Sequence, residues 1–305
     1  MSSRSRAFVA ILIASVLWGT AGVAAKTLVH DVNPFVASFY RFLIASILIL
    51  PFFLREHKPR LVWQDLLPLS ILGAMNVPLF YLGIKTTTAN SATLIYTATP
   101  LATALFSSLL IQEIHSRRKL LGIFIGLVGA VFIILLPVIE KGSIVTGDLT
   151  GNLIIVGAML SWTLYTVGSR HIHTHDTYSP LTVTSIYFFT TTLLSLLLSI
   201  LTKQQFFPSA LFSPMYVFTL FYSGIFITLI TYFLFQWAIK RISVTTASLK
   251  QYIEPIVGVS LNTMLLGEKI STGFIIGSFL VVLGVTIATG SKILSAMKKK
   301  FFVNS

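Results

Sequence analysis

The chain has 305 residues, of which 55% are hydrophobic and 10% are charged, and its mean hydropathy is +0.87. This composition is typical of a chain that lives in lipid, and it leaves little sequence for a soluble domain. The formal net charge of +13 would otherwise suggest nucleic acid, and the absence of cysteine excludes disulfides and thiolate metal sites.

Apolar stretches follow one another along the whole chain. A helix needs roughly 20 apolar residues to cross a hydrocarbon core of about 30 Å. The sequence therefore predicts an all-α integral membrane protein with ten transmembrane helices, near residues 8–28, 34–54, 65–84, 89–111, 119–137, 149–169, 181–201, 215–237, 245–266 and 271–290.

The lysines and arginines predict how these spans are oriented, because positive residues are enriched in cytoplasmic loops. With the N-terminus inside, fifteen of them fall on the inner face and five on the outer face, and only Arg41 and Lys250 fall within spans. We expect both termini to be cytoplasmic, with a basic tail at 291–305, in the inner or plasma membrane of the cell. The charge is then mostly a signal of topology, and no nucleic-acid partner is expected.

The first two spans each contain residues that are expensive in lipid. Trp18 shares a small and polar helix face with Ser15, Gly19, Gly22 and Lys26. Arg41 lies about two turns from the outer end of the second span. We favour snorkelling of Arg41 to the interface, or a hydrogen bond to a nearby carbonyl, and keep a gate or an anion contact as the alternative.

The third and fourth spans add polar and helix-breaking residues. Unsatisfied backbone is tolerated in a membrane only where protein or a water-filled cavity covers it, so prolines within spans indicate such places. We expect breaks or gates at Pro78 and Pro100, and at Pro255 in the ninth span, which is equivalent to Pro100. The polar residues expected to face the cavity are Asn76, Tyr81 and Tyr96.

The second half carries a similar set. Trp162 and Tyr165 lie in the sixth span, and Tyr232 and Gln236 lie in the eighth. We expect these four side chains to complete one substrate-binding site with those of the first half.

The ninth span contains a group of three polar residues, two of them charged. Lys250 and Glu254 are neighbours on one helix face, beside Gln251. A charge at the membrane centre costs roughly 2.5–3.5 kcal/mol, so such residues pair, face a cavity, or both. A structural ion pair, a pair that contacts substrate, and a proton-coupling role for Glu254 remain alternatives.

The chain also contains a repeat. Residues 83–129 match residues 238–284 at a constant offset of 155, with Pro100 in register with Pro255 and Glu113 with Glu268. Upstream, an offset of about 144 pairs Trp18 with Trp162. An odd number of spans in each copy forces opposite orientations. We therefore predict two inverted five-helix repeats, at 7–137 and 149–290.

Short motifs in both halves resemble a known family. They are Leu17-Trp18-Gly19, Tyr40-Arg41-Phe42, and Leu265-Leu266-Gly267-Glu268-Lys269 followed by Gly273, Gly277 and Gly284. The chain resembles the EamA family of the drug/metabolite transporter superfamily over nearly its whole length, although Gln112 replaces the motif glycine in the first copy. The resemblance implies a ten-helix inverted-repeat carrier that moves small metabolites by alternating access, and it implies no particular substrate.

These observations predict a secondary transporter rather than an enzyme, with no cofactor and no metal. Its partners would be the lipid bilayer and a small-molecule substrate. Aromatic residues at the expected cavity favour an amino acid or a related amphipathic metabolite, exported or exchanged, with nucleoside-type or other cationic metabolites as the alternative. We expect a monomer and leave a homodimer open. A receptor, or an intramembrane enzyme using His171, His173, His175 and Asp176, is the remaining alternative.

Overall fold

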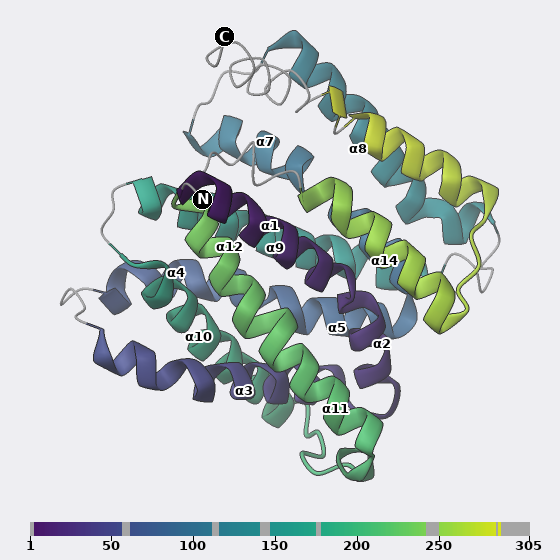
Figure 1. The fold of residues 1–305 in the computed structure, drawn as a ribbon. Coiled ribbons are helices and arrows are strands. Elements are labelled where there is room, and N and C mark those ends of the chain that lie inside the picture. The colour runs from purple at the N-terminus through teal and green to yellow at the C-terminus, as the bar shows by residue number, and fades with distance from the viewer. Residues whose placement is uncertain are drawn as a thin grey trace.

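A computed structural model of the protein describes residues 3–56, 62–111, 116–140, 147–174, 178–241, 250–284 and 286–287. Within these residues the chain is helical and contains no strand, which confirms the prediction of an all-α protein (Figure 1). The elements are α1 (Ser3–Gly19), α2 (Ala21–Asp31), α3 (Pro34–Arg55), α4 (Val62–Ala74), α5 (Asn76–Thr86), α6 (Ala89–Thr97), α7 (Thr99–Ile111), α8 (Arg117–Ile139), α9 (Leu149–Thr174), α10 (Pro180–Leu201), the 3-10 helix η1 (Ser209–Phe212), α11 (Pro214–Tyr222), the π-helix η2 (Ser223–Ile230), α12 (Thr231–Ile239) and α14 (Lys250–Leu266), followed by a helix at Thr272–Gly284.

Six helical segments of the described chain are long and apolar enough to cross a membrane: Arg6–Asp31, Pro34–Arg55, Val62–Thr86, Leu149–His173, Pro180–Leu201 and Pro214–Ile239. Shorter apolar helices cover Leu120–Leu136, Ile253–Leu266 and Thr272–Gly284. Helix is present in each of the ten predicted ranges, but the fourth range is divided between α6 and α7. The count of ten membrane crossings stays a prediction.

Several helices begin where a polar side chain can satisfy the free N–H groups of the first turn. Asn33, Thr88 and Ser179 each accept a hydrogen bond from a backbone N–H two or three residues later, at the starts of α3, α6 and α10. Pro34 and Pro180 occupy the first helical position of α3 and α10, where an N–H is not needed.

The exterior of the molecule is apolar and its polar atoms are turned inward. Leu54, Phe124 and Phe279 are each more than 60% exposed. By contrast, the buried hydroxyls of Thr190 and Thr191 in α10 donate to carbonyls one turn earlier. This arrangement suits a lipid solvent, in which polar groups must find partners within the protein.

Hydrogen bonds connect α2 to the start of α9. Near the end of α2, Lys26 Nζ donates to the carbonyls of Ile84 (2.8 Å) and Thr87 (2.6 Å). Thr87 Oγ1 in turn donates to Asn152 Oδ1 (2.5 Å), near the start of α9. The sixth predicted span therefore starts at the end of the molecule where the first one finishes.

Helix contacts in one half have counterparts in the other. Helix α5 of the third predicted span packs against α9 of the sixth, and α12 of the eighth packs against α1 of the first. Similarly, α10 of the seventh packs against α4 of the third, and η2 of the eighth against α3 of the second. Helices α3 and α10, in second place in their repeats, pack along each other (Figure 1).

Glycines allow α8 and the helix at Thr272–Gly284 to pack closely at one edge of the molecule (Figure 1). A Cβ atom on Gly129 would lie 2.7 Å from Leu280 Cβ, and one on Gly284 would lie 2.3 Å from Gly126 N. The close approach lies within the chain, as expected of small residues in membrane helices.

Candidate functional site

One cavity lies where helices of both halves meet. It encloses about 650 Å³ of space not filled by atoms, including the part that is open to solvent. The lining residues are Trp18, Gly19, Ala21, Gly22, Arg41, Asn76, Val77, Phe80, Ala92, Thr93, Tyr96, Trp162, Tyr232 and Glu254.

Several helices that line the cavity are interrupted close to it. Thr20 separates α1 from α2, Met75 separates α4 from α5, and Ala98 separates α6 from α7. In the eighth predicted span the irregular segment is the π-helix η2, which ends at Ile230. Irregular backbone of this kind is tolerated at membrane depth only where protein or a cavity covers it.

The three predicted break-forming prolines occupy different positions. Pro78 is the third residue of α5 and Pro100 is the second of α7, so each follows an interruption and needs no helical N–H donor. Pro255 lies inside α14, which is continuous from Lys250 to Leu266. Within the described residues, the interruption near Pro100 therefore has no matching one at Pro255.

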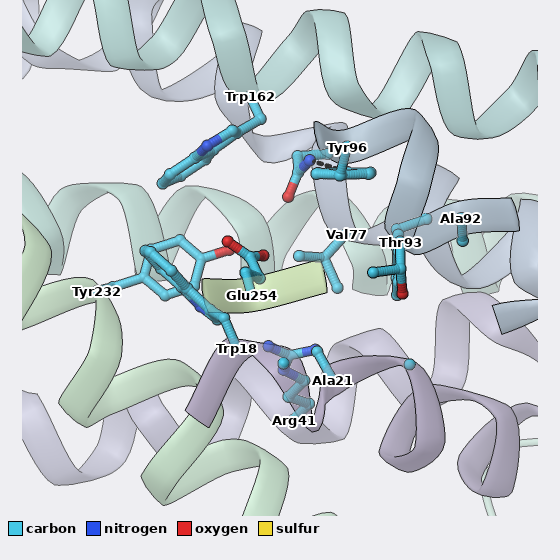
Figure 2. A pocket seen from close by; sticks show the side chains of 14 residues that line it. Trp18, Ala21, Arg41, Val77, Ala92, Thr93, Tyr96, Trp162, Tyr232 and Glu254 are labelled. Atoms are coloured by element: carbon cyan, nitrogen blue, oxygen red, sulfur yellow. Dashed lines mark hydrogen bonds between the residues drawn. The ribbon is translucent and has the colours of Figure 1, made fainter. Parts of the chain in front are cut away.

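An aromatic group forms one wall. The Trp18 ring is 5.8 Å from that of Trp162 and 5.5 Å from that of Tyr232, with edge-to-face geometry in both pairs. Trp162 and Tyr232 are 5.4 Å apart, and Phe235 packs behind them. Trp18 and Trp162, which the repeat predicted to be equivalent, therefore meet in space (Figure 2).

Polar side chains on the opposite wall are held by hydrogen bonds. Asn76 Nδ2 donates to Tyr96 Oη (2.5 Å) and to the carbonyl oxygen of Ala158 (2.8 Å). Tyr96 lies on the same side of the cavity as Val77 and Thr93 in Figure 2, and Asn76 lines the same cavity. The wall therefore presents neutral donors and acceptors.

Arg41 does not reach the outer interface, so the prediction of snorkelling is wrong. The hydrogen bonds that were the other part of that interpretation are present, but they go to side-chain hydroxyls and not to a carbonyl. Its side chain is 4% exposed and lines the cavity. Nε donates to Thr228 Oγ1 (2.6 Å) and Nη1 donates to Tyr81 Oη (3.2 Å). The inward orientation follows from these two partners, which lie on the third and eighth predicted spans and are not recognisable as neighbours from the sequence.

The charged group of the ninth predicted span is described in part. Glu254 lines the cavity from α14 and points into it in Figure 2. The side chains of Lys250 and Gln251 lie outside the described residues.

Three predicted site residues are buried away from the cavity lining. Tyr81 contributes indirectly, through its hydrogen bond to Arg41. Tyr165 Oη accepts from Gln236 Nε2 (3.0 Å), and Gln236 Oε1 lies 2.9 Å from His173 Nε2. These contacts join α9 to α12 and make Tyr165 and Gln236 part of the packing.

Phe80 also lines the cavity, although it was not predicted as a site residue. It lies one turn after Asn76 on the same face of α5, and its ring packs edge-to-face against Tyr96. Helical spacing from Asn76 was the signal that could have found it.

The histidine-rich segment has no metal-binding geometry in its described part. His171 is exposed and His173 is buried against Gln236, whereas His175 and Asp176 lie outside the described residues. Among the described residues, no group of three potential metal ligands comes together.

Lys26 and Glu268 form a polar cluster with backbone groups near the start of α6. Glu268 accepts hydrogen bonds from the N–H groups of Ala89 (2.7 Å) and Asn90 (2.8 Å) at the start of α6. Burial raises the pKa of Glu268, while these two hydrogen bonds and the charge of Lys26 oppose the shift. The motif glutamate therefore joins the end of the ninth predicted span to the beginning of the fourth.

Comparison with known proteins identifies the group to which this chain is related. The EamA-like transporter family matches residues 5–135 and again residues 149–290. The chain belongs to the EamA-like transporter family. The two matched segments agree with the two halves seen in the helix contacts.

Similar proteins include other members with transporter names. An uncharacterized transporter of Clostridium kluyveri is 26% identical over 291 residues, covering 92% of each chain. A WAT1-related protein of Arabidopsis thaliana is 24% identical, covering 95% of this chain and 85% of its own. One crystal structure superposes with a TM-score of 0.64 at 22% identity, over 95% of this chain and 96% of that chain, and so shares the fold. This EamA-like protein is a multi-pass membrane protein, and its relatives support membrane transport.

Proposed function

We propose that the protein is a secondary carrier in which two inverted five-helix repeats, ten spans in all, move a small metabolite by alternating access. The observation that supports this most directly is the cavity, whose lining comes from both halves of the chain. Trp18 of the first half and Trp162 of the second pack against each other there. Carrier sites typically lie at the interface between repeats, near the bilayer midplane.

The inverted arrangement is supported by the direction of the helices. Helix α9 starts at the end of the molecule where α2 finishes, and the contacts of one half have counterparts in the other. Two halves of opposite orientation can rock against each other and open a central site to either side in turn. We place the protein in the plasma or inner membrane as a monomer, with both termini cytoplasmic.

The cavity favours an amino acid or a related amphipathic metabolite, exported or exchanged. Trp18, Trp162 and Tyr232 provide an aromatic surface for an apolar or planar part of the substrate, and Asn76 and Tyr96 provide polar contacts. Aromatic faces also attract cations, which favours nucleoside-type cations as a second candidate. Arg41 lines the same cavity and opposes a substrate that is only cationic.

Transport in proteoliposomes tests this function. The purified protein would be reconstituted, and uptake and efflux would be measured for a panel of amino acids, nucleosides and organic cations. Trp162→Leu should lower the initial rate about tenfold, as expected for the loss of roughly 1.5 kcal/mol of aromatic contact.

Trp63→Leu is the matched control for this experiment. Trp63 is 46% exposed on α4 and is not part of the cavity lining, so its loss should leave the rate within about twofold of wild type. If no compound of the panel crosses the membrane with the wild-type protein, the proposed function is wrong. A pH profile of the same flux in Glu254→Gln would show whether that residue couples transport to protons.

A further inference from the structure

Arg41 is a buried cation without a carboxylate neighbour in the described part of the chain. No carboxylate oxygen there lies within 4.0 Å of its guanidinium nitrogens. A guanidinium carries five N–H donors, and the two hydrogen bonds to Thr228 and Tyr81 leave others that can bind a ligand in the cavity. A charge at membrane depth costs roughly 2.5–3.5 kcal/mol, which an anionic ligand group would offset.

The protein holds this guanidinium in a fixed place. Its carbon lies 5.7 Å from the ring centres of Phe42 and Tyr81. Thr228, the acceptor for Nε, belongs to η2 and donates its own hydroxyl proton to the carbonyl of Ser223 (2.9 Å). A π-helix thus aligns the hydroxyl that orients Arg41, and such segments are frequent at functional sites.

Glu254 provides the opposite charge in the same cavity. It projects from α14, whereas Arg41 projects from α3, and both extend into the space between the labelled side chains in Figure 2. An ionised carboxylate has about four acceptor positions, so it can receive an ammonium group in addition to the contacts it already makes. The two side chains are not within ion-pair distance of each other.

A cavity with separate positive and negative groups discriminates between ligand classes. A ligand that is only anionic would leave Glu254 facing a like charge, and a cation would meet the same difficulty at Arg41. A molecule that carries both charges satisfies both. The adjoining aromatic wall of Trp18, Trp162 and Tyr232 would then receive its apolar part.

We propose that the cavity is a zwitterion site in which Arg41 binds the carboxylate of the substrate and Glu254 binds its ammonium group. This inference rests on the proposed transport function and specifies the head group that is recognised. Tyr81 and Thr228 are positioning residues, since they act on the substrate through Arg41.

Binding of three related probes to the purified protein tests the assignment. Phenylalanine carries both charges, phenethylamine lacks the carboxylate, and 3-phenylpropionate lacks the ammonium group. Wild-type protein should bind phenylalanine at least about tenfold more tightly than either analogue, because a charge-assisted hydrogen bond contributes roughly 1.5–3 kcal/mol.

Substitutions of Arg41 and Glu254 should change the binding of different probes. Arg41→Gln should weaken phenylalanine binding at least about tenfold and leave phenethylamine unaffected or bound more tightly. Glu254→Gln should weaken phenylalanine binding and leave 3-phenylpropionate unaffected or bound more tightly. Retained binding of the unaffected analogue also shows that each variant is folded.

The positioning variants keep the test decisive if Arg41→Gln does not fold. Tyr81→Phe and Thr228→Val retain the cation but loosen it, and should reduce the preference for phenylalanine over phenethylamine by several fold. An unchanged preference in both variants would overturn the assignment.

Two results with the wild-type protein would also overturn the zwitterion assignment but leave the carrier function standing. One is equal binding of the three probes. The other is binding of none of them while another metabolite is transported. Absence of flux for every compound would remove the proposed function and this inference together.

Discussion

Replacing Gly284 by alanine tests the contact between α8 and the helix at Thr272–Gly284. The added Cβ would lie 2.3 Å from Gly126 N and 2.4 Å from Gly126 Cα, where ordinary contacts are 3.4–4 Å. The obstructing atoms are backbone, so the helices must separate by about 1 Å. Overpacking costs about 1–3 kcal/mol, and this site should reach the upper end of the range.

Part of that cost is offset, because alanine in a helix is favoured over glycine by about 1 kcal/mol. We expect Gly284→Ala to lower the free energy of unfolding by about 2 kcal/mol. Gly157→Ala in α9 is the matched control, because its Cβ would meet only Leu79 Cδ1 at 3.7 Å. It should be stabilised by about 1 kcal/mol.

Thermal unfolding in detergent measures the difference between these two variants. The separation of about 3 kcal/mol corresponds to a difference in Tm of roughly 5 °C for a chain of this length, with Gly284→Ala the less stable. Equal Tm values for the two variants, or a more stable Gly284→Ala, would refute the claim that these helices pack backbone to backbone.

Three further predictions concern the polar contacts. Glu268→Ala removes the acceptor of two backbone N–H groups, so its Tm should fall by several degrees. The Tm of Glu268→Gln should fall by less, because glutamine keeps one oxygen acceptor. Equal losses of Tm in the two variants would contradict the capping role. Because burial raises the pKa of Glu268, the stability that this residue contributes is fully present below the unfolded-chain pKa of about 4 and is lost as the pH rises through the raised value. The Tm of wild type relative to Glu268→Gln should therefore fall modestly as the pH rises above about 4, and a rise would contradict the sign. Lys26→Met leaves the carbonyls of Ile84 and Thr87 without their donor, so hydrogen exchange should accelerate at the start of α6, and unchanged protection there would count against the contact.

Composition and periodicity were sufficient to predict much of the fold. Apolar stretches predicted the helices, because a segment that spans lipid must form hydrogen bonds between its own backbone N–H and C=O groups. The repeat placed Trp18 and Trp162 in equivalent positions, and the structure brings the two rings together. The interruptions at Thr20 and Met75 were not predicted, since neither residue is a strong helix breaker and both breaks depend on tertiary packing.

The cavity was predicted less completely. Asn76 and Tyr96 were selected because polar residues are rare in spans, and both line the cavity. Arg41 was misjudged because a single sequence shows the length of its side chain but not the hydroxyl groups of Tyr81 and Thr228 that receive it. Tyr165 and Gln236 are polar residues within apolar spans, as the residues that line the cavity are. They bind each other instead, and the sequence does not distinguish a polar residue that packs from one that lines a cavity.

The divided helices have a mechanical consequence. Helices α1 and α2 form one membrane-length segment, and so do α4 and α5. In each segment the joint between the two helices is a single residue next to the cavity. A jointed rod can bend in its middle while its outer ends keep their depth in the lipid. In the proposed carrier cycle, bending at these positions would need neither long loops nor helices sliding through the bilayer, and it would move residues that line the cavity.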